Sequence, residues 1–195
     1  MTVVENDRIE MAMSNPEPTL DEIFAGIEKA FPEGYRFDVV EGNIFMSPQR
    51  PTHWDIIADI YEQLRTEYPR KRILSDVRID YPGYLNGFCS DVTLLREGAT
   101  ADENGRYACE DVLFVGEVVS KRTGMNDYGP KKEAYAAAGV AVYLVADPYT
   151  GRCKVYSHPK DGEYMSESKF DFGDVIDLTD TDLGLTISTA EFPRD

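Results

Sequence analysis

The chain has 195 residues, 36 of them acidic and 20 basic, which gives a formal net charge of −16. This length suits one domain with a substantial core, and no apolar run approaches the ~20 residues that a transmembrane helix requires. Strong acidity repels nucleic acid at long range, so a nucleic-acid partner would have to be held by a local basic patch. Acidity also favours solubility, and this is the simpler explanation for the excess of acidic residues.

Residues 1–18 are polar, contain proline and show no pattern, so we expect a mobile tail before one domain at 19–195. No secretory signal is predicted, which makes the cytoplasm the default location. The three cysteines, Cys89, Cys109 and Cys153, form no CxxC pair. They predict reduced thiols rather than a disulfide framework or a zinc site.

Two helices and a hairpin are predicted in the first 70 residues. Thr19 and Glu22 fit a capping box before an amphipathic helix, which Pro32 and Gly34 should end. Residues 35–48 predict two strands around a turn at 41–43. Pro48 and Pro51 should break the pattern before a second helix at 53–68. The apolar faces expected for these helices are Leu20, Ile23, Phe24, Ile27 and Phe31, then Trp54, Ile57, Tyr61, Leu64 and Tyr68.

The remaining chain predicts mainly strands. Residues 71–95 form two β segments separated by Pro82 and Gly83, and a strand is expected at 112–119 after a loop. A turn-rich stretch then leads to a helix at 131–139, with Asp127 as its N-cap and Pro130 in its first turn. The apolar run 140–147 predicts a central strand covered on both faces. A strand at 152–158, a short hairpin and an irregular segment should close a mixed α/β or α+β fold.

Four acidic residues interrupt apolar strand patterns: Asp38, Asp76, Asp91 and Glu117. A carboxylate on a half-exposed strand usually faces solvent, and we assign Asp76 to that case. Asp91 and Glu117 are flanked by apolar residues, and two neighbouring strands that brought them together would form a hard-oxygen site suited to Mg²⁺.

Lys131 opens the helix that follows the Glu117 strand, and Tyr135 lies one turn further on the same face. The alternative for Lys131 is a solvated lysine, for which Lys132 could substitute.

The segment 116–148 resembles the signature of the Uma-type putative restriction endonucleases, which belong to the PD-(D/E)xK nuclease superfamily. Ser90, Asp91 and Val92 stand where the family has Pro-Asp-Val, and His53 matches the start of the second helix. The likeness extends over residues 19–192. The matching signature positions are Glu117, Val118, Ser120, Asp127, Lys131, Tyr135, Gly139, Asp147 and Pro148.

The resemblance implies a restriction-endonuclease-like core, with a mixed central sheet flanked by helices. It also implies Mg²⁺ or Mn²⁺ on Asp91, Glu117 and the carbonyl of Val118. Lys131 would be catalytic, in place of the superfamily lysine two residues after the Glu, where this chain has Val119. Asp38 replaces a family Glu and could add a ligand through water. Ser90 should alter the turn before Asp91 but not its carboxylate.

Three further positions are accessory candidates. His53 is either a phosphate contact or a structural residue, and Ser120 either binds a carboxylate or caps a turn. Tyr135 is interpreted as packing.

The functional prediction is a metal-dependent endonuclease that hydrolyses phosphodiester bonds, with DNA as the expected substrate and a homodimer expected by analogy with two-fold duplex cleavage. RNA, single strands and branched DNA stay open. The basic residues Lys121 and Arg122, with Lys131 and Lys132, could form a phosphate-binding rim. The alternative is a catalytically inactive nuclease-fold module for protein interaction or assembly. The acidity and the absence of a separate DNA-reading motif support it.

Overall fold

The structure is a computed structural model that describes residues 17–31, 36–46 and 50–195. Residues 1–16 of the expected tail, and the expected breakers Pro32, Gly34 and Pro48, lie outside these ranges. Residues 17–19 precede the first helix without regular structure. No helix in the described ranges is both long and apolar enough to cross a bilayer.

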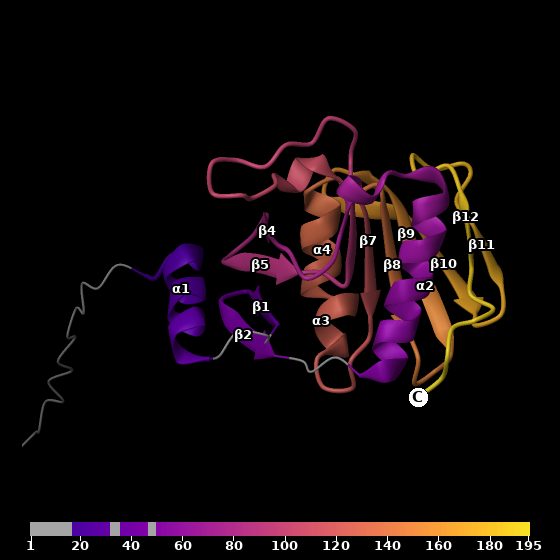
Figure 1. Cartoon of the computed structure of the whole chain (residues 1–195), viewed down its shortest axis with the longest axis horizontal. Coiled ribbons are helices and arrows are strands. Elements are labelled where there is room, and N and C mark those ends of the chain that lie inside the picture. The colour runs from indigo at the N-terminus through magenta and orange to yellow at the C-terminus, as the bar shows by residue number, and fades with distance from the viewer. Residues whose placement is uncertain (1–16, 32–35, 47–49) are drawn as a thin grey trace, which may run out of the picture.

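Four α-helices alternate with strands along the described chain (Figure 1). The helices are α1 (Leu20–Ala30), α2 (Pro51–Glu67), α3 (Gly124–Tyr128) and α4 (Pro130–Ala137). The strands are β1 (Phe37–Val40), β2 (Asn43–Met46), β3 (Ile73–Leu74), β4 (Arg78–Tyr81), β5 (Asn86–Cys89), β6 (Val92–Leu95), β7 (Val112–Val118), β8 (Val142–Asp147), β9 (Arg152–Lys160), β10 (Glu163–Asp171), β11 (Val175–Asp177) and β12 (Thr186–Ser188).

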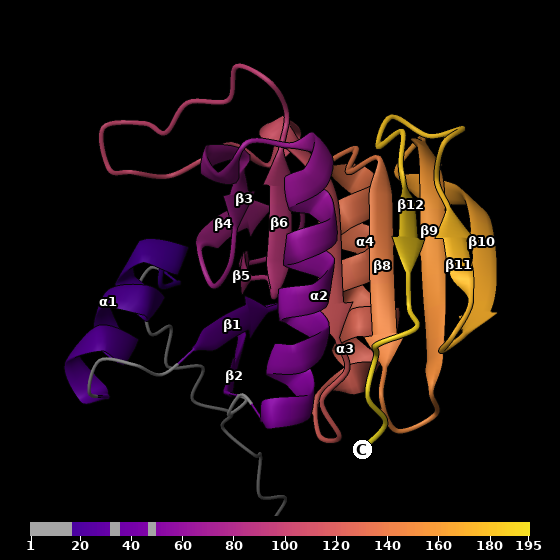
Figure 2. The same ribbon diagram turned by 45° about the vertical axis from the view of Figure 1, so that its right-hand side comes forward.

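The central sheet has six strands in the order β10-β9-β8-β7-β6-β3. Only β7 and β8 pair in parallel, and the connection between them carries α3 and α4. Residues of β7 alternate between the two faces, so Phe114 packs with α2 while Val115 packs with α4. Helices α2 and α4 therefore cover opposite faces, with the β11–β12 ribbon on the side of α2 (Figure 2). The predicted mixed sheet flanked by helices is confirmed.

A second sheet of four strands, in the order β2-β1-β5-β4, lies beside α4. Its outer face packs on α1 through Phe24 and Ile27, and its inner face packs on Tyr135 through Phe88 and Tyr81. Because β5 belongs to this sheet and β6 to the central one, the chain crosses between the sheets at residues 90–91. The candidate site lies at this crossing.

The early elements follow the prediction closely. Thr19 and Glu22 form the expected capping box, and the hairpin turns at 41–42. The prediction that Pro51 breaks the pattern is wrong, since Pro51 is the first residue of α2; a proline has no N–H to lose there. Trp54 is also wrongly placed on the apolar face: it is 55% exposed, and Ile56 and Ile60 are buried instead.

Three later predictions need correction. The turn-rich segment contains a helix, α3, and Asp127 lies inside it rather than capping the next helix, whose N-cap is Gly129. The closing hairpin is long, because β9 and β10 each have nine residues. The segment after it forms the β11–β12 ribbon rather than staying irregular.

Candidate active site

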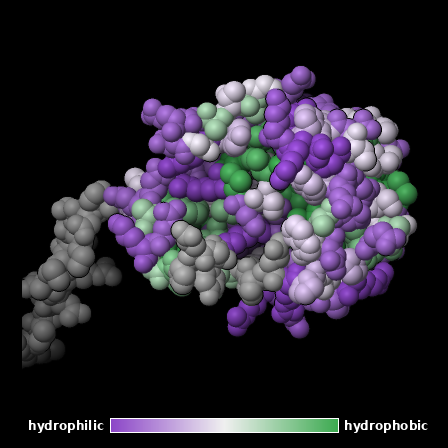
Figure 3. All heavy atoms as spheres, viewed as in Figure 1, coloured by the Kyte–Doolittle hydropathy of each residue, from purple (hydrophilic) through white to green (hydrophobic). Residues whose placement is uncertain are grey.

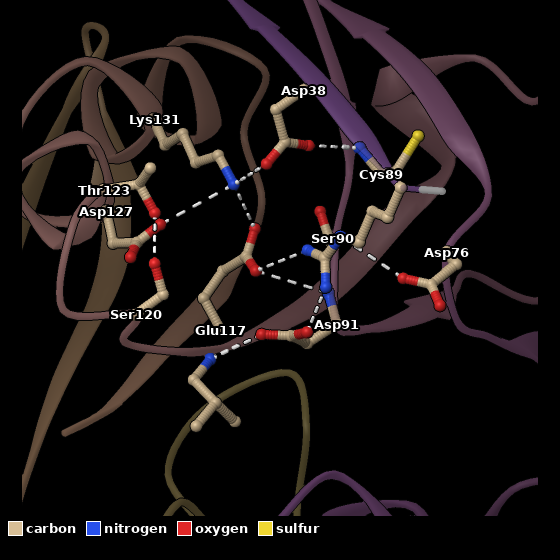
Figure 4. A network of polar contacts seen from close by, with 12 residues as sticks. Asp38, Asp76, Cys89, Ser90, Asp91, Glu117, Ser120, Thr123, Asp127 and Lys131 are labelled. Atoms are coloured by element: carbon tan, nitrogen blue, oxygen red, sulfur yellow. Dashed lines mark hydrogen bonds and ion pairs between the residues drawn. The ribbon is translucent and has the colours of Figure 1, made fainter. Parts of the chain in front are cut away.

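Four elements meet at the crossing between the sheets. Asp38 comes from β1, Asp91 directly precedes β6, Glu117 lies near the end of β7, and Lys131 begins α4 (Figure 4). The antiparallel register between β6 and β7 pairs residue 92 with residue 116, which sets Asp91 against Glu117. The structure therefore brings together the carboxylates and the lysine that the sequence singled out.

Glu117 is buried, and both of its carboxylate oxygens are occupied. Oε1 accepts a hydrogen bond from the hydroxyl of Tyr135 at 2.8 Å and one from the ammonium of Lys131 at 3.0 Å. Oε2 accepts one from the backbone N–H of Asp91 at 3.3 Å. The hydroxyl of Tyr135 also lies 2.8 Å from Ser90 Oγ. Because the proton of Tyr135 goes to the carboxylate, Ser90 donates in that second bond.

Asp91 is fixed by the opposite strand. Its Oδ2 accepts the backbone N–H of Val118 at 2.7 Å. Asp38 is held in the same way, because its Oδ1 accepts the backbone N–H of Cys89 at 2.8 Å. Each of these carboxylates therefore has one oxygen tied to a strand and one facing the site, a rigid arrangement of the kind that a preformed binding site needs.

Lys131 is almost fully buried and is surrounded by acids. Its Nζ lies 2.8 Å from Asp38 Oδ2, 3.0 Å from Glu117 Oε1 and 3.6 Å from Asp127 Oδ1. Burial lowers the pKa of Lys131, but Asp38, Glu117 and Asp127 outweigh it, and the net shift is upward. Lys131 is therefore a permanent positive charge rather than a general base. It does not contribute to a surface rim, and Lys132 points instead toward the ring of Tyr156.

Asp127 behaves differently from the other acids. Burial raises its pKa to about 8, although the ammonium of Lys131 acts in the opposite direction. The ammonium is shared with two closer carboxylates, so it stabilises an ionised Asp127 only weakly. Asp127 therefore contacts Lys131 from the side of α3, and its carboxyl keeps its proton to a higher pH than an ordinary aspartate does.

Arg36, directly before β1, was not predicted to belong to the site. Its Nη1 contacts Asp91 Oδ1, its Nη2 lies 3.3 Å from Glu117 Oε2, and its Nε lies 3.3 Å from Asp76 Oδ1. Asp76 is exposed, as predicted, but it takes part in this ion-pair network. An isolated arginine beside a strand gives no signal in the sequence, because its acidic partners lie 55 and 81 residues away.

A cavity of about 40 Å³ opens between these groups and is lined by Arg36, Asp91, Glu117, Lys131 and His53 among others. It has room for an ion or a few water molecules. His53 is buried, and neither of its ring nitrogens has a hydrogen-bond partner among the described residues. His53 therefore lines the cavity with hydrogen-bonding capacity that no described residue uses.

The hydroxyl of Ser120 bonds that of Thr123 at 2.5 Å rather than a carboxylate. The carbonyl of Ser120 accepts the N–H of Gly124 at 3.0 Å, so Ser120 stabilises the turn into α3. Tyr135 does more than pack, since it donates to Glu117. The three cysteines are buried and separate from one another.

The donor set fits a divalent cation with one condition. No group of three or more His, Cys, Asp or Glu side chains in the described ranges is arranged as a metal cluster. However, Asp91 and Glu117 both contact one guanidinium, so a cationic group already lies between them. Their oxygens and the carbonyl of Val118 are ligand types that Mg²⁺ uses. A metal can bind them if Arg36 moves away.

Comparison with a solved structure identifies the fold class. A crystal structure at 1.96 Å of a putative nuclease belonging to DUF820 from Anabaena variabilis ATCC 29413 superposes with a TM-score of 0.66. The match covers 90% of this chain and 97% of that one, at 17% sequence identity. The chain thus has the fold of that nuclease-like protein. No curated protein matches the sequence significantly.

The family follows from the sequence model for Uma2, described as a putative restriction endonuclease, which matches residues 21–190. The chain belongs to the Uma2 family. This finding confirms the resemblance that residues 116–148 carry.

Proposed function

We propose that the protein is an endonuclease that hydrolyses DNA phosphodiester bonds with Mg²⁺ or Mn²⁺. The observation that supports this most is the convergence of Asp91, Glu117 and Lys131 from three separate elements in one buried cavity. Two buried carboxylates this close need a cation beside them; the guanidinium of Arg36 fills that need in this structure, and a metal would fill it in the proposed enzyme. Membership of a family of putative restriction endonucleases points the same way.

The roles follow from the contacts. Asp91 and Glu117, with the carbonyl of Val118, would hold the metal, which when bound supplies an acidified water and neutralises phosphate charge. Lys131, held charged by its acidic neighbours, would stabilise negative charge that develops on the phosphate. Tyr135 fixes the orientation of Glu117. Asp38 reaches Lys131 and is assigned the role of positioning it.

Plasmid nicking tests the assignment. Wild-type protein, Glu117→Gln and the control Glu97→Gln should be compared on supercoiled DNA with Mg²⁺ and with Mn²⁺. Glu97 is exposed beyond the far end of β6. We expect Glu117→Gln to lose at least about a hundredfold in rate, since it removes a charge that binds the metal, and Glu97→Gln to cleave normally. Equal cleavage by all three proteins contradicts the role of Glu117.

The second candidate is a catalytically inactive module that uses the nuclease fold for interaction or assembly. Arg36 favours it, because a guanidinium already neutralises the two carboxylates. The net charge of −16 also favours it. Titration of wild-type protein with Mn²⁺ by calorimetry separates the two functions: absence of binding at millimolar metal supports the module.

A homodimer is part of the leading proposal, because two-fold symmetry would match the two strands of a duplex. Light scattering coupled to size exclusion tests it, and a monomer at all concentrations contradicts it.

A further inference from the structure

Arg36 contacts the oxygens that a metal would need. Asp91 Oδ2 is occupied by the N–H of Val118, and Glu117 Oε1 by Tyr135 and Lys131. The oxygens most open to a cation are Asp91 Oδ1 and Glu117 Oε2, of which Oε2 also accepts the long hydrogen bond from the backbone N–H of Asp91 at 3.3 Å. These are the two that the guanidinium of Arg36 contacts.

The guanidinium is firmly cationic. Burial lowers the pKa of Arg36, but the negative charges of Asp91 and Glu117 raise it by more. The net pKa of Arg36 is therefore well above its ordinary value. The side chain of Arg36 is 21% exposed, while those of Asp91 and Glu117 are 4% and 2% exposed. Arg36 therefore approaches the buried carboxylates from the more open side of the site.

The charge balance of the site explains why a guanidinium lies between Asp91 and Glu117. Without Arg36 or a metal, the buried carboxylates of Asp91 and Glu117 and the partly buried one of Asp38 would have the ammonium of Lys131 as their main positive charge. Leaving a buried charge without its partner is strongly destabilising. A guanidinium and a divalent ion cannot use the same two oxygens at once, so one must replace the other.

We infer that Arg36 is a built-in cation that exchanges with the divalent metal at Asp91 and Glu117, so that metal binding is a replacement rather than the filling of an empty site. The inference rests on the proposed metal site and goes beyond it. It gives Arg36 a positioning role: it keeps the two carboxylates in place in the metal-free protein and lowers their affinity for metal.

Calorimetry with MnCl₂ on the full chain tests the exchange. Arg36→Gln removes the competing charge, and we expect it to bind Mn²⁺ about tenfold more tightly than wild type or better. Arg36→Lys keeps the positive charge but lacks the planar guanidinium whose N–H groups contact two carboxylates at once. We therefore expect its affinity for Mn²⁺ to lie between those of wild type and Arg36→Gln. The matched control is Arg78→Gln, which also removes a partly buried arginine that bridges two acids, Asp80 and Asp21. It should bind Mn²⁺ as wild type does.

Thermal unfolding gives a second readout that does not depend on activity. Metal-free Arg36→Gln should melt below wild type, and added Mn²⁺ should raise its melting temperature by more than it raises that of wild type. If Arg36→Gln does not fold without metal, Arg36→Lys carries both measurements.

The outcomes separate the two proposals. Equal affinity in wild type and Arg36→Gln, or weaker binding by the variant, overturns the exchange and leaves the nuclease proposal standing. If Arg36→Gln binds Mn²⁺ and the wild-type protein does not, the exchange is supported. The proposal that the wild-type protein is a metal-dependent nuclease is then contradicted. Binding by no variant overturns both.

Discussion

At the scale of single residues, the site is a chain of hydrogen bonds that ends on Glu117. Ser90 donates to Tyr135, and Tyr135 donates to Glu117. Ser90 stands where the family has proline, so this chain has gained a donor that proline cannot supply. The departure from the family pattern is therefore used within the site rather than merely tolerated.

Removing the hydroxyl of Tyr135 tests this chain. Tyr135→Phe keeps the packing against Tyr81, Phe88 and Tyr143 but removes the hydroxyl that donates to Glu117 Oε1. We expect the free energy of unfolding to fall by about 1.5–3 kcal/mol, as for a buried hydrogen bond to a charged group, measured by urea denaturation.

The control for this prediction is Tyr84→Phe. Its hydroxyl also donates to a carboxylate, that of Glu17 at 3.1 Å, but at an exposed position. Its effect should stay within about 0.5 kcal/mol. A similar fall in the free energy of unfolding of both variants would mean that burial does not determine how much the hydrogen bond stabilises the protein.

At the scale of elements, α4 carries Lys131 and Tyr135 one turn apart on one face, and its end is fixed by a Schellman motif. The N–H of Gly139 bonds the carbonyl of Ala136 at 3.0 Å, and that of Val140 bonds the carbonyl of Tyr135 at 3.1 Å. Gly139 has a φ of +73°, a left-handed conformation that other residues adopt only with strain. The glycine therefore sets where the helix ends and β8 begins.

Two glycine substitutions of the same kind should change stability in opposite directions. No atom lies within 4 Å of a Cβ added at Gly139 or at Gly26. Gly139→Ala should lose about 1–2 kcal/mol because of its positive φ, whereas Gly26→Ala, in the exposed middle of α1, should gain roughly 0.5–1 kcal/mol. Thermal denaturation measures both, and a gain at Gly139 would contradict the left-handed geometry.

At the scale of the whole molecule, the net charge of −16 opposes the proposed substrate. Hydrophilic side chains cover most of the face in Figure 3. Near the cavity, Lys121 and Arg122 are exposed and follow Ser120, which lines it. Since Lys131 is buried, these two residues are the part of the predicted basic rim that a phosphate backbone could reach.

Replacing this pair should weaken binding to DNA. Lys121→Gln with Arg122→Gln should lower affinity for a short labelled duplex several-fold at low salt and reduce the salt slope by up to about 2. Fluorescence anisotropy without metal measures this. The control is Arg70→Gln with Lys71→Gln, an exposed basic pair beyond the opposite end of α2 from His53. An equal loss of DNA affinity in both double variants would mean that binding depends on the total charge of the protein and not on the position of the basic residues.

The sequence by itself determined the main elements and the mixed sheet, which depend on local signals: the capping box at Thr19 and the apolar periodicity of the strands. It also marked Asp91 and Glu117 as carboxylates out of place within strands, whereas their convergence with Lys131 was predicted from the family resemblance. The ion pair between Asp127 and Lys131 was not predicted, because Asp127 was expected to cap the helix of Lys131. The two residues lie in successive helices, α3 and α4, and the bend between these helices brings them together.

Only the tertiary structure decided how the charges of the site are paired. Arg36 reaches Asp91 and Glu117 because the small sheet, which Arg36 directly precedes, packs beside the end of β7, a contact between residues 81 positions apart. The ring nitrogens of His53, which have no hydrogen-bond partner among residues 17–31, 36–46 and 50–195, and the hydrogen bond from Ser90 arise in the same way. Such contacts follow from the packing of whole sheets, and no periodicity within a single element encodes them.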